Sequence, residues 1–86
     1  MQEITKQSIS GTLAKQMFAI GVNVRRLRVR DKMTQEDVAF YLQTNKSTVS
    51  AMERGMLDNV TVRSLIKISV LFSVSIESLF DKDFVS

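Results

Sequence analysis

The chain contains no cysteine, no histidine and no proline. Without cysteine there are no disulfides and no thiol chemistry, and without cysteine and histidine the usual zinc ligands are missing. The sequence also offers no convergent group of carboxylates, and so small a chain leaves little room for a pocket. We therefore expect no enzyme, no cofactor, no metal site and no small-molecule ligand. The absence of proline allows helices to run over long spans.

The chain also lacks a long apolar run. Its most apolar region, residues 64–80, is interrupted by Lys67, Glu77 and several serines, so it is unsuited to cross a bilayer. Near the start, Lys6 and Lys15 break up the apolar residues, and no signal peptide is recognisable. Eighty-six residues suffice for one domain, and a net charge of +3 favours a nucleic-acid partner only weakly. We expect a soluble, cytoplasmic protein.

Residues 34–55 predict two short helices joined by a tight turn. Thr34, with an aspartate three residues later, predicts a capping box, Asn45 is a good N-cap for the second helix, and Gly55 can adopt the left-handed conformation that ends it. The small Ala39 allows the two helices to cross closely. Apolar residues recur at helical spacing, at Val38, Ala39, Leu42, Val49 and Met52. This plan is typical of a DNA-binding helix-turn-helix.

A long helix is predicted before this unit, from Leu13 to about Arg30. Its apolar face consists of Leu13, Met17, Ile20, Val24 and Leu27. Gly21 interrupts the pattern and indicates either close packing or a break in the helix. Residues 1–12 predict a separate N-terminal arm, either a frayed terminus or a segment that contacts DNA or a second subunit.

Basic residues gather at the end of this helix, with Asp31 as the one acid among them. They are Arg25, Arg26, Arg28, Arg30 and Lys32. Such a run forms either a solvated helix face or an edge that faces DNA phosphates, and the run alone favours neither interpretation.

Two further helices are predicted after Gly55. Thr61 caps the first, whose buried side is expected to hold Val62, Leu65, Ile66, Ser69 and Phe72. Ser75 caps a short fifth helix with apolar residues at Ile76, Leu79 and Phe80. Residues 74–85 are unusually apolar for so thin an element, which indicates either a partner surface or the closure of the monomer core.

The polar face of the second short helix carries Lys46, Ser47, Ser50 and Ala51, on the side away from Val49 and Met52. A helix in the major groove would direct these residues at base edges, where lysine, serine and alanine all have suitable partners. Gln35 begins the preceding helix, whose free amides can hold a phosphate. An ordinary solvated helix would look similar, but no acid stands between Asn45 and Met52, which favours DNA.

Several motifs occur together, although none is specific alone. They are Ile20-Gly21, Val24-Arg25-Arg26-Leu27-Arg28, Met33-Thr34-Gln35-Glu36-Asp37-Val38-Ala39, Thr48-Val49-Ser50, Met52-Glu53-Arg54-Gly55 and Val74-Ser75-Ile76-Glu77-Ser78-Leu79-Phe80. Through them the chain resembles, over about residues 20–80, the lambda-repressor-like helix-turn-helix domains of the Xre and Cro family. The resemblance implies an all-α, five-helix domain at residues 13–80, between the N-terminal arm and a tail of residues 81–86.

The resemblance also implies a role for each site residue. Base edges would be contacted by Lys46, Ser47 and Ala51. The groove edge and the phosphates would be contacted by Gln35, Asn45, Thr48, Ser50 and Arg54. Arg28 would pair with Glu53 and tie the first helix to the third. A homodimer would form through the fifth helix, with Val74, Ile76, Leu79 and Phe80 at its interface.

The implied function is a transcription regulator that reads a palindromic site in double-stranded DNA as a homodimer. It would control its own expression, as Cro-like proteins or restriction-modification controllers do. A DNA-binding antitoxin and a protein-interaction adaptor on the same fold are the alternatives. The chain departs from the family at Gln43 and Ser73, where glycine is frequent, and at Phe40 and Tyr41, where polar residues are usual. The two aromatic residues would pack against the N-terminal extension or mark another contact.

Overall fold

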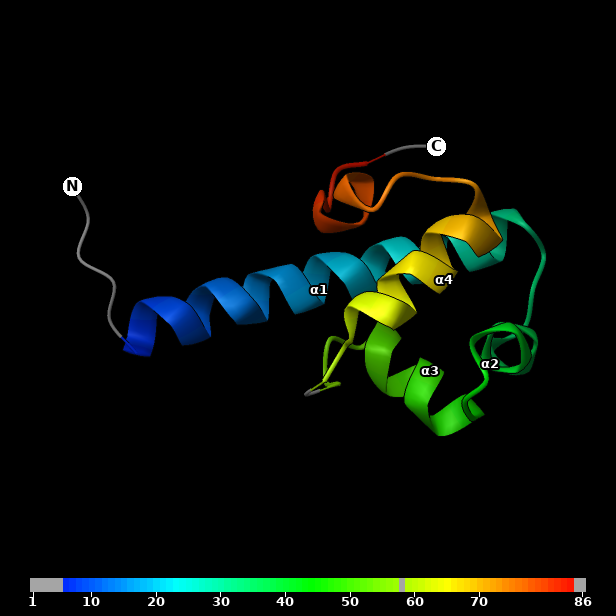
Figure 1. Cartoon of the computed structure of the whole chain (residues 1–86), viewed down its shortest axis with the longest axis horizontal. Helices are drawn as coiled ribbons and strands as arrows, with labels where there is room; N and C mark the ends of the chain where they lie inside the picture. Colours follow the sequence, from blue (N-terminus) through cyan, green and yellow to red (C-terminus); the bar gives the residue numbers. More distant parts are fainter. Residues whose placement is uncertain (1–5, 58, 85–86) are drawn as a thin grey trace.

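The computed structural model describes residues 6–57 and 59–84, which form an all-helical domain with no strand in that part of the chain. The all-α prediction is therefore confirmed. Figure 1 shows the long first helix running across the molecule, with the shorter elements grouped around its C-terminal half. In chain order the elements are α1 (Lys6–Arg30), α2 (Gln35–Leu42), α3 (Lys46–Glu53), α4 (Val62–Phe72) and the 3₁₀ helix η1 (Glu77–Phe80).

α1 begins earlier than the sequence analysis predicts. Its first turn starts at Lys6, so the described part of the predicted arm, residues 6–12, is helical rather than separate. Residues 8–15 are exposed, and the helix projects beyond the core there. Leu13 is consequently exposed, and its placement on the buried face is wrong. Residues 1–5 of the arm lie outside the described residues.

The core lies between α1, α2, α3, α4 and η1, and each of the five elements contributes at least one buried hydrophobic residue to it. The predicted apolar positions of the helix-turn-helix are confirmed, because all five are buried: Val38, Ala39, Leu42, Val49 and Met52. The remaining buried hydrophobic residues of the core cluster are Ile20, Val24, Leu27, Ile68, Phe72 and Leu79. Gly21 is also buried and faces the backbone of α3, so close packing, and not a helix break, explains this glycine.

α4 presents a different face to the core than expected. Ile68 and Phe72 are fully buried, whereas Val62 and Ile66, both predicted to be buried, are exposed. Apolar residues occur on more than one side of this helix, and periodicity alone therefore does not select the side that packs. The predicted cap is confirmed, since the Thr61 hydroxyl accepts a hydrogen bond from the Ser64 amide at 3.1 Å.

The predicted fifth helix is a single 3₁₀ turn. Its N-cap residue is Ile76, which makes no side-chain cap hydrogen bond, so the prediction that Ser75 is the cap is wrong. The Ser75 hydroxyl still accepts a hydrogen bond from the Ser78 amide at 3.2 Å, from the position just before the cap. Leu79 is fully buried, so the prediction that it lies on a dimer surface is wrong: it closes the monomer core. Val74 and Ile76 are partly buried, and Phe80 keeps some exposure. A dimer role for these three residues stays a prediction.

Among the described residues, three that are not glycine adopt the left-handed conformation, and two of them stand where the resemblance leads us to expect glycine. Gln43 has φ 58° and Ser73 has φ 55°, each at the C-terminal end of a helix; Lys32, with φ 56°, is the third. Both ends are closed by amides that turn back onto the helix, from Thr44 to the Ala39 carbonyl and from Val74 to the Ser69 carbonyl. Both turns therefore use a left-handed residue without glycine, and the side chain at that position costs some conformational free energy.

Candidate nucleic-acid interface

The helix-turn-helix is fixed at both of its N-termini by caps. Thr34 and Asp37 form the predicted capping box: the Thr34 hydroxyl accepts from the Asp37 amide at 3.0 Å, and the Asp37 carboxylate accepts from the Thr34 amide at 2.8 Å. At α3, the Asn45 side chain accepts from the Thr48 amide at 2.9 Å and from the Thr48 hydroxyl at 3.0 Å. The two side chains predicted for the groove edge therefore hold one another and order the start of α3.

Arg28 and Glu53 form the predicted ion pair between α1 and α3. The contact is bidentate, at 2.6 Å from Nε to Oε2 and 3.0 Å from Nη2 to Oε1, and the third guanidinium nitrogen donates to the Met33 carbonyl at 3.0 Å. Hydrogen bonding to Glu53 raises the pKa of Arg28 above its ordinary value. Because both side chains are largely buried, this pair sets the position of α3 relative to α1 and to the loop before α2.

Gln35 joins the same network from α2. Its amide nitrogen donates to Glu53 Oε1 at 3.2 Å. A side-chain amide carries two hydrogens, so one remains for a phosphate oxygen. Glu53 thus connects three helices and holds Gln35 at the N-terminus of α2, where the sequence analysis expects a backbone contact.

α3 has one buried and one open side. Val49 and Met52 anchor it in the core. On the open side, Lys46 and Ser47 are exposed, whereas Ser50 and Ala51 are only partly exposed. The first turn of the helix is thus the most accessible part of the predicted base-contacting face.

An acidic side chain from α2 lies beside this face, which the sequence analysis does not anticipate. Glu36 Oε1 is 3.5 Å from the Lys46 ammonium nitrogen. Glu36 belongs to α2 and not to α3, and the turn between the two helices brings it to Lys46. Both side chains are mostly exposed, so the pair is weak and can be broken by a competing phosphate or base.

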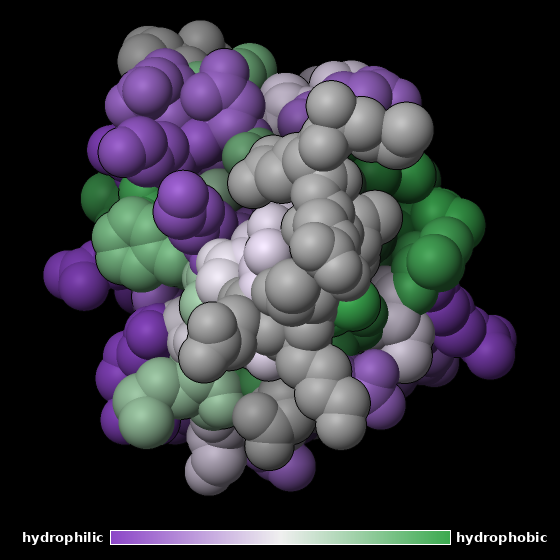
Figure 2. All heavy atoms as spheres, turned by 90° about the vertical axis from the view of Figure 1, so that its left-hand side faces the viewer, coloured by the Kyte–Doolittle hydropathy of each residue, from purple (hydrophilic) through white to green (hydrophobic). Residues whose placement is uncertain are grey.

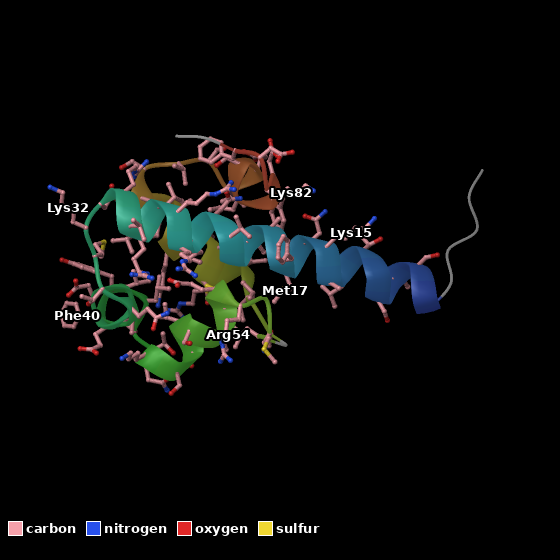
Figure 3. All side chains as sticks on the ribbon, turned by 180° about the vertical axis from the view of Figure 1, so that it is seen from behind. Lys15, Met17, Lys32, Phe40, Arg54 and Lys82 are labelled. Atoms are coloured by element: carbon pink, nitrogen blue, oxygen red, sulfur yellow. The ribbon has the colours of Figure 1, made fainter. Side chains whose placement is uncertain are left out.

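Arg54 follows α3 and is exposed. Figure 3 shows it at the end of α3, on the outside of the molecule. Its Nε lies 3.3 Å from the Ser50 carbonyl oxygen, which leaves the rest of the guanidinium group free to bind an anion. This placement is compatible with the predicted phosphate contact at the C-terminal end of α3.

Most of the basic run at the end of α1 has internal partners. Arg28 binds Glu53, Arg26 donates to the Lys82 carbonyl, and Arg30 binds Asp31 and the Phe72 carbonyl. In the described part of the chain, Arg25 and Lys32 make no such hydrogen bond or ion pair. The run therefore holds the fold together more than it forms a phosphate-binding edge.

Comparison with known families identifies the family to which this domain belongs. A helix-turn-helix family model of the lambda-repressor and Xre-like type matches residues 24–79. The chain belongs to this helix-turn-helix family. Its members are DNA-binding regulatory domains. Comparisons with curated proteins and with solved structures gave no match.

Three features of this helix-turn-helix protein bear on other functions. No group of side chains suited to hold a metal ion occurs among the described residues, and none of the described helices is long and apolar enough to cross a membrane. The aromatic residues of α2 are exposed: Phe40 and Tyr41 form an edge-to-face pair with ring centroids 5.4 Å apart. Phe40 and the first turns of α1 lie at opposite ends of the molecule in Figure 3, so these rings do not pack against the described N-terminal extension.

The sequence analysis missed one buried polar residue that supports the domain. Asn23 lies on α1 and is 1 % exposed. Its amide nitrogen donates to three carbonyl oxygens around η1, those of Ser78, Leu79 and Asp81, at 3.3, 2.9 and 2.8 Å. Its side-chain oxygen has no hydrogen-bond partner in the described structure. A polar residue within an apolar helix face was the only signal in the sequence, and it does not identify a partner 55 residues away.

Proposed function

We propose that this DNA-binding regulator acts as a homodimer that reads a palindromic operator with α3 in the major groove. The observation that carries the proposal is the geometry of α3: its inner side is anchored by Val49 and Met52, while Lys46 and Ser47 extend into solvent from its first turn. N-terminal residues of a recognition helix are the ones that contact base edges in this motif.

The proposed contacts fall into two groups. Lys46 and Ser47 contact base edges directly, and Ser50 and Ala51 also face the bases, from further along the helix. Residues at the helix ends contact the sugar-phosphate backbone and set the register: Gln35, Asn45, Thr48 and Arg54. Phosphate contacts supply affinity for any duplex, and base contacts supply the preference for one sequence.

Two copies are needed because one eight-residue helix reaches few base pairs. A dimer that places two α3 helices about 34–36 Å apart would contact successive major grooves of a two-fold symmetric site. We further propose that this site lies upstream of the protein's own gene and that the protein works in the cytoplasm, on the nucleoid. A regulator that occupies its own promoter responds to its own concentration.

The test is a binding titration with DNA from upstream of the gene and with a scrambled duplex of equal length, over a series of salt concentrations. The proposal predicts a clear preference for the upstream DNA, two protomers per site, and an affinity that falls steeply as salt rises. Equal binding to both duplexes would mean that the operator does not lie in this upstream DNA, and selection from a pool of random duplexes would then identify it. No binding to any duplex at low salt would contradict the proposal.

A second candidate is a protein-interaction adaptor on the same fold, and the exposed pair Phe40 and Tyr41 is the observation that favours it. Phe40 is 76 % and Tyr41 57 % exposed, and large aromatic residues on a surface are typical of protein interfaces. The double substitution Phe40→Ser with Tyr41→Ser separates the two functions. A regulator would keep its DNA affinity in this variant, whereas an adaptor would lose its partner and would show no DNA affinity in either form.

A further inference from the structure

α4 carries an apolar stripe that the monomer leaves uncovered. Val62, Ile66 and Val70 follow one another at intervals of four residues and are 70, 47 and 73 % exposed. Residues at this spacing lie along one side of a helix. Figure 2, which has the front of Figure 1 at its right, shows an apolar area at that edge. We call these three residues the α4 stripe.

The α4 stripe is complementary to itself. If two copies of α4 pack antiparallel about Ile66, each Val62 lies opposite Val70 of the second copy, and the two Ile66 side chains meet on the two-fold axis. Aliphatic residues then face aliphatic residues along the whole contact, at the 8–10 Å between helix axes usual for packed helices.

The charges of α4 are compatible with this pairing. In the same antiparallel register Arg63 lies opposite Ser69, and Lys67 lies opposite Leu65, so no two cations oppose one another. The Lys67 ammonium group is held within its own subunit, where it donates to the Gln43 side-chain oxygen at 2.8 Å. No acid or base of α4 therefore needs to be buried without a partner.

The pairing also suits a DNA-binding dimer. In Figure 1 α4 lies in front of α1, and α3 lies below α4. Consider a two-fold axis that lies in front of α4, parallel to the plane of the picture and perpendicular to the helix. Rotation about this axis brings a second copy of α4 against the first and leaves the α3 helices of both copies on the same side of the dimer. Both would then face one duplex.

We propose that the α4 stripe is the interface through which two copies of this chain pair. The inference rests on the proposed homodimeric function and locates its interface on α4 instead of η1. Three aliphatic residues a side bury less than the roughly 800 Å² per partner of a stable complex, so the free dimer is weak and DNA binding completes it.

Cysteine cross-linking tests the geometry directly, because the chain has no cysteine of its own. In Ile66→Cys the two thiols meet on the axis, and diamide oxidises them to one disulfide while it takes up the two electrons and two protons. We expect rapid conversion to a covalent dimer. Phe40→Cys, more exposed but far from the axis, is the matched control. Equal rates for the two variants would overturn the proposal.

Sedimentation of Ile66→Gln separates this inference from the proposed function. Because Ile66 is half exposed, the variant should fold normally, which its circular dichroism would verify, and self-association should weaken by about tenfold. Phe80→Gln should self-associate like the unchanged chain. If Ile66→Gln still binds its operator as two protomers with undiminished affinity, the interface is wrong and the regulator function stands. If the unchanged chain pairs through Ile66 but binds no DNA, the interface stands and the function fails.

Discussion

Gly21 of α1 lies directly against the carbonyl oxygen of Met52 in α3. A Cβ atom on Gly21 would overlap that oxygen and would lie 2.9 Å from the carbonyl oxygen of Glu53. The two helices can therefore approach this closely only because residue 21 has no side chain. This glycine therefore fixes how closely α3, which carries the proposed base contacts, approaches α1.

Gly21→Ala is expected to destabilise the domain, because backbone atoms of α3 cannot move aside as a flexible side chain could. We expect a loss of about 1–3 kcal/mol in the free energy of unfolding, the range for an overpacked core. Gly11→Ala is the matched control, since a Cβ there would meet nothing within 4 Å. Alanine should stabilise the exposed helix at that position by up to about 1 kcal/mol. Thermal unfolding measures both, and shifts of the same sign would contradict this account of Gly21.

Glu53→Ala would leave the Arg28 guanidinium, a largely buried group, without its partner and would free the Gln35 side chain. We expect it to cost about 1–3 kcal/mol of stability. Asp31→Ala is the control: it removes the carboxylate that binds Arg30 at the C-terminal end of α1, but that pair is exposed, so its loss should cost clearly less than the loss of Glu53. Chemical denaturation gives the free energy of unfolding of both variants. Equal losses of this free energy would mean that the Arg28–Glu53 pair stabilises the fold no more than a surface contact does.

Local sequence signals sufficed to predict the helix-turn-helix. The caps at Thr34 and Asn45 act within three residues, and Val49 and Met52 lie on one side of a helix that is too short to lose its register. The pairing of Arg28 with Glu53 required the family resemblance, because 25 residues separate the two side chains. The reason for a glycine at position 21 became clear only from the structure, because the sequence allowed either close packing of helices or a break in the helix.

Apart from the local extension of α1, the features that the sequence failed to predict depend on tertiary contacts. α4 is apolar on more than one side, and the side that packs is decided by where α1 and α2 lie. α1 continues to Lys6 because nothing in residues 6–12 stops a helix, while polarity alone had suggested a separate arm. The proximity of Glu36 to Lys46 and of Asn23 to η1 likewise depends on how separate elements come together in the fold.

Asn23→Asp should detach η1 from α1. The substitution keeps the shape of the side chain but replaces the donating amide by a carboxylate, which would face the Leu79 and Asp81 carbonyl oxygens. We expect a loss of about 3 kcal/mol, since a buried charge adds to the lost hydrogen bonds. Asn59→Asp, an exposed position with the same change in charge, should be nearly neutral.

Hydrogen exchange shows whether the loss is local. The Leu79 amide donates to the Ile76 carbonyl at 3.0 Å within η1. It should exchange much faster in Asn23→Asp, while amides of α2 and α3 change less. Uniform acceleration across all helices would mean that Asn23 supports the whole core and not η1 in particular.

Glu36→Gln should tighten binding to any duplex. Glu36 lies beside the proposed base contact Lys46, where its charge repels phosphates and competes for the ammonium group. For an exposed pair the gain is at most about 1 kcal/mol, or about fivefold in affinity. Anisotropy titrations with operator and scrambled DNA should show similar gains on both. An unchanged affinity would place Glu36 outside the electrostatic reach of the DNA.

Lys46→Ala and Arg54→Ala should weaken DNA binding in different ways, because the first residue is proposed to contact a base and the second a phosphate. Lys46→Ala should cost about 1–3 kcal/mol at the operator and relax the preference for the base pair that it contacts. Arg54→Ala should weaken operator and scrambled DNA alike and reduce the salt slope by about one unit. Both side chains are exposed, so neither change should alter folding. Identical losses for the two variants on both duplexes would contradict the division between base and backbone contacts on α3.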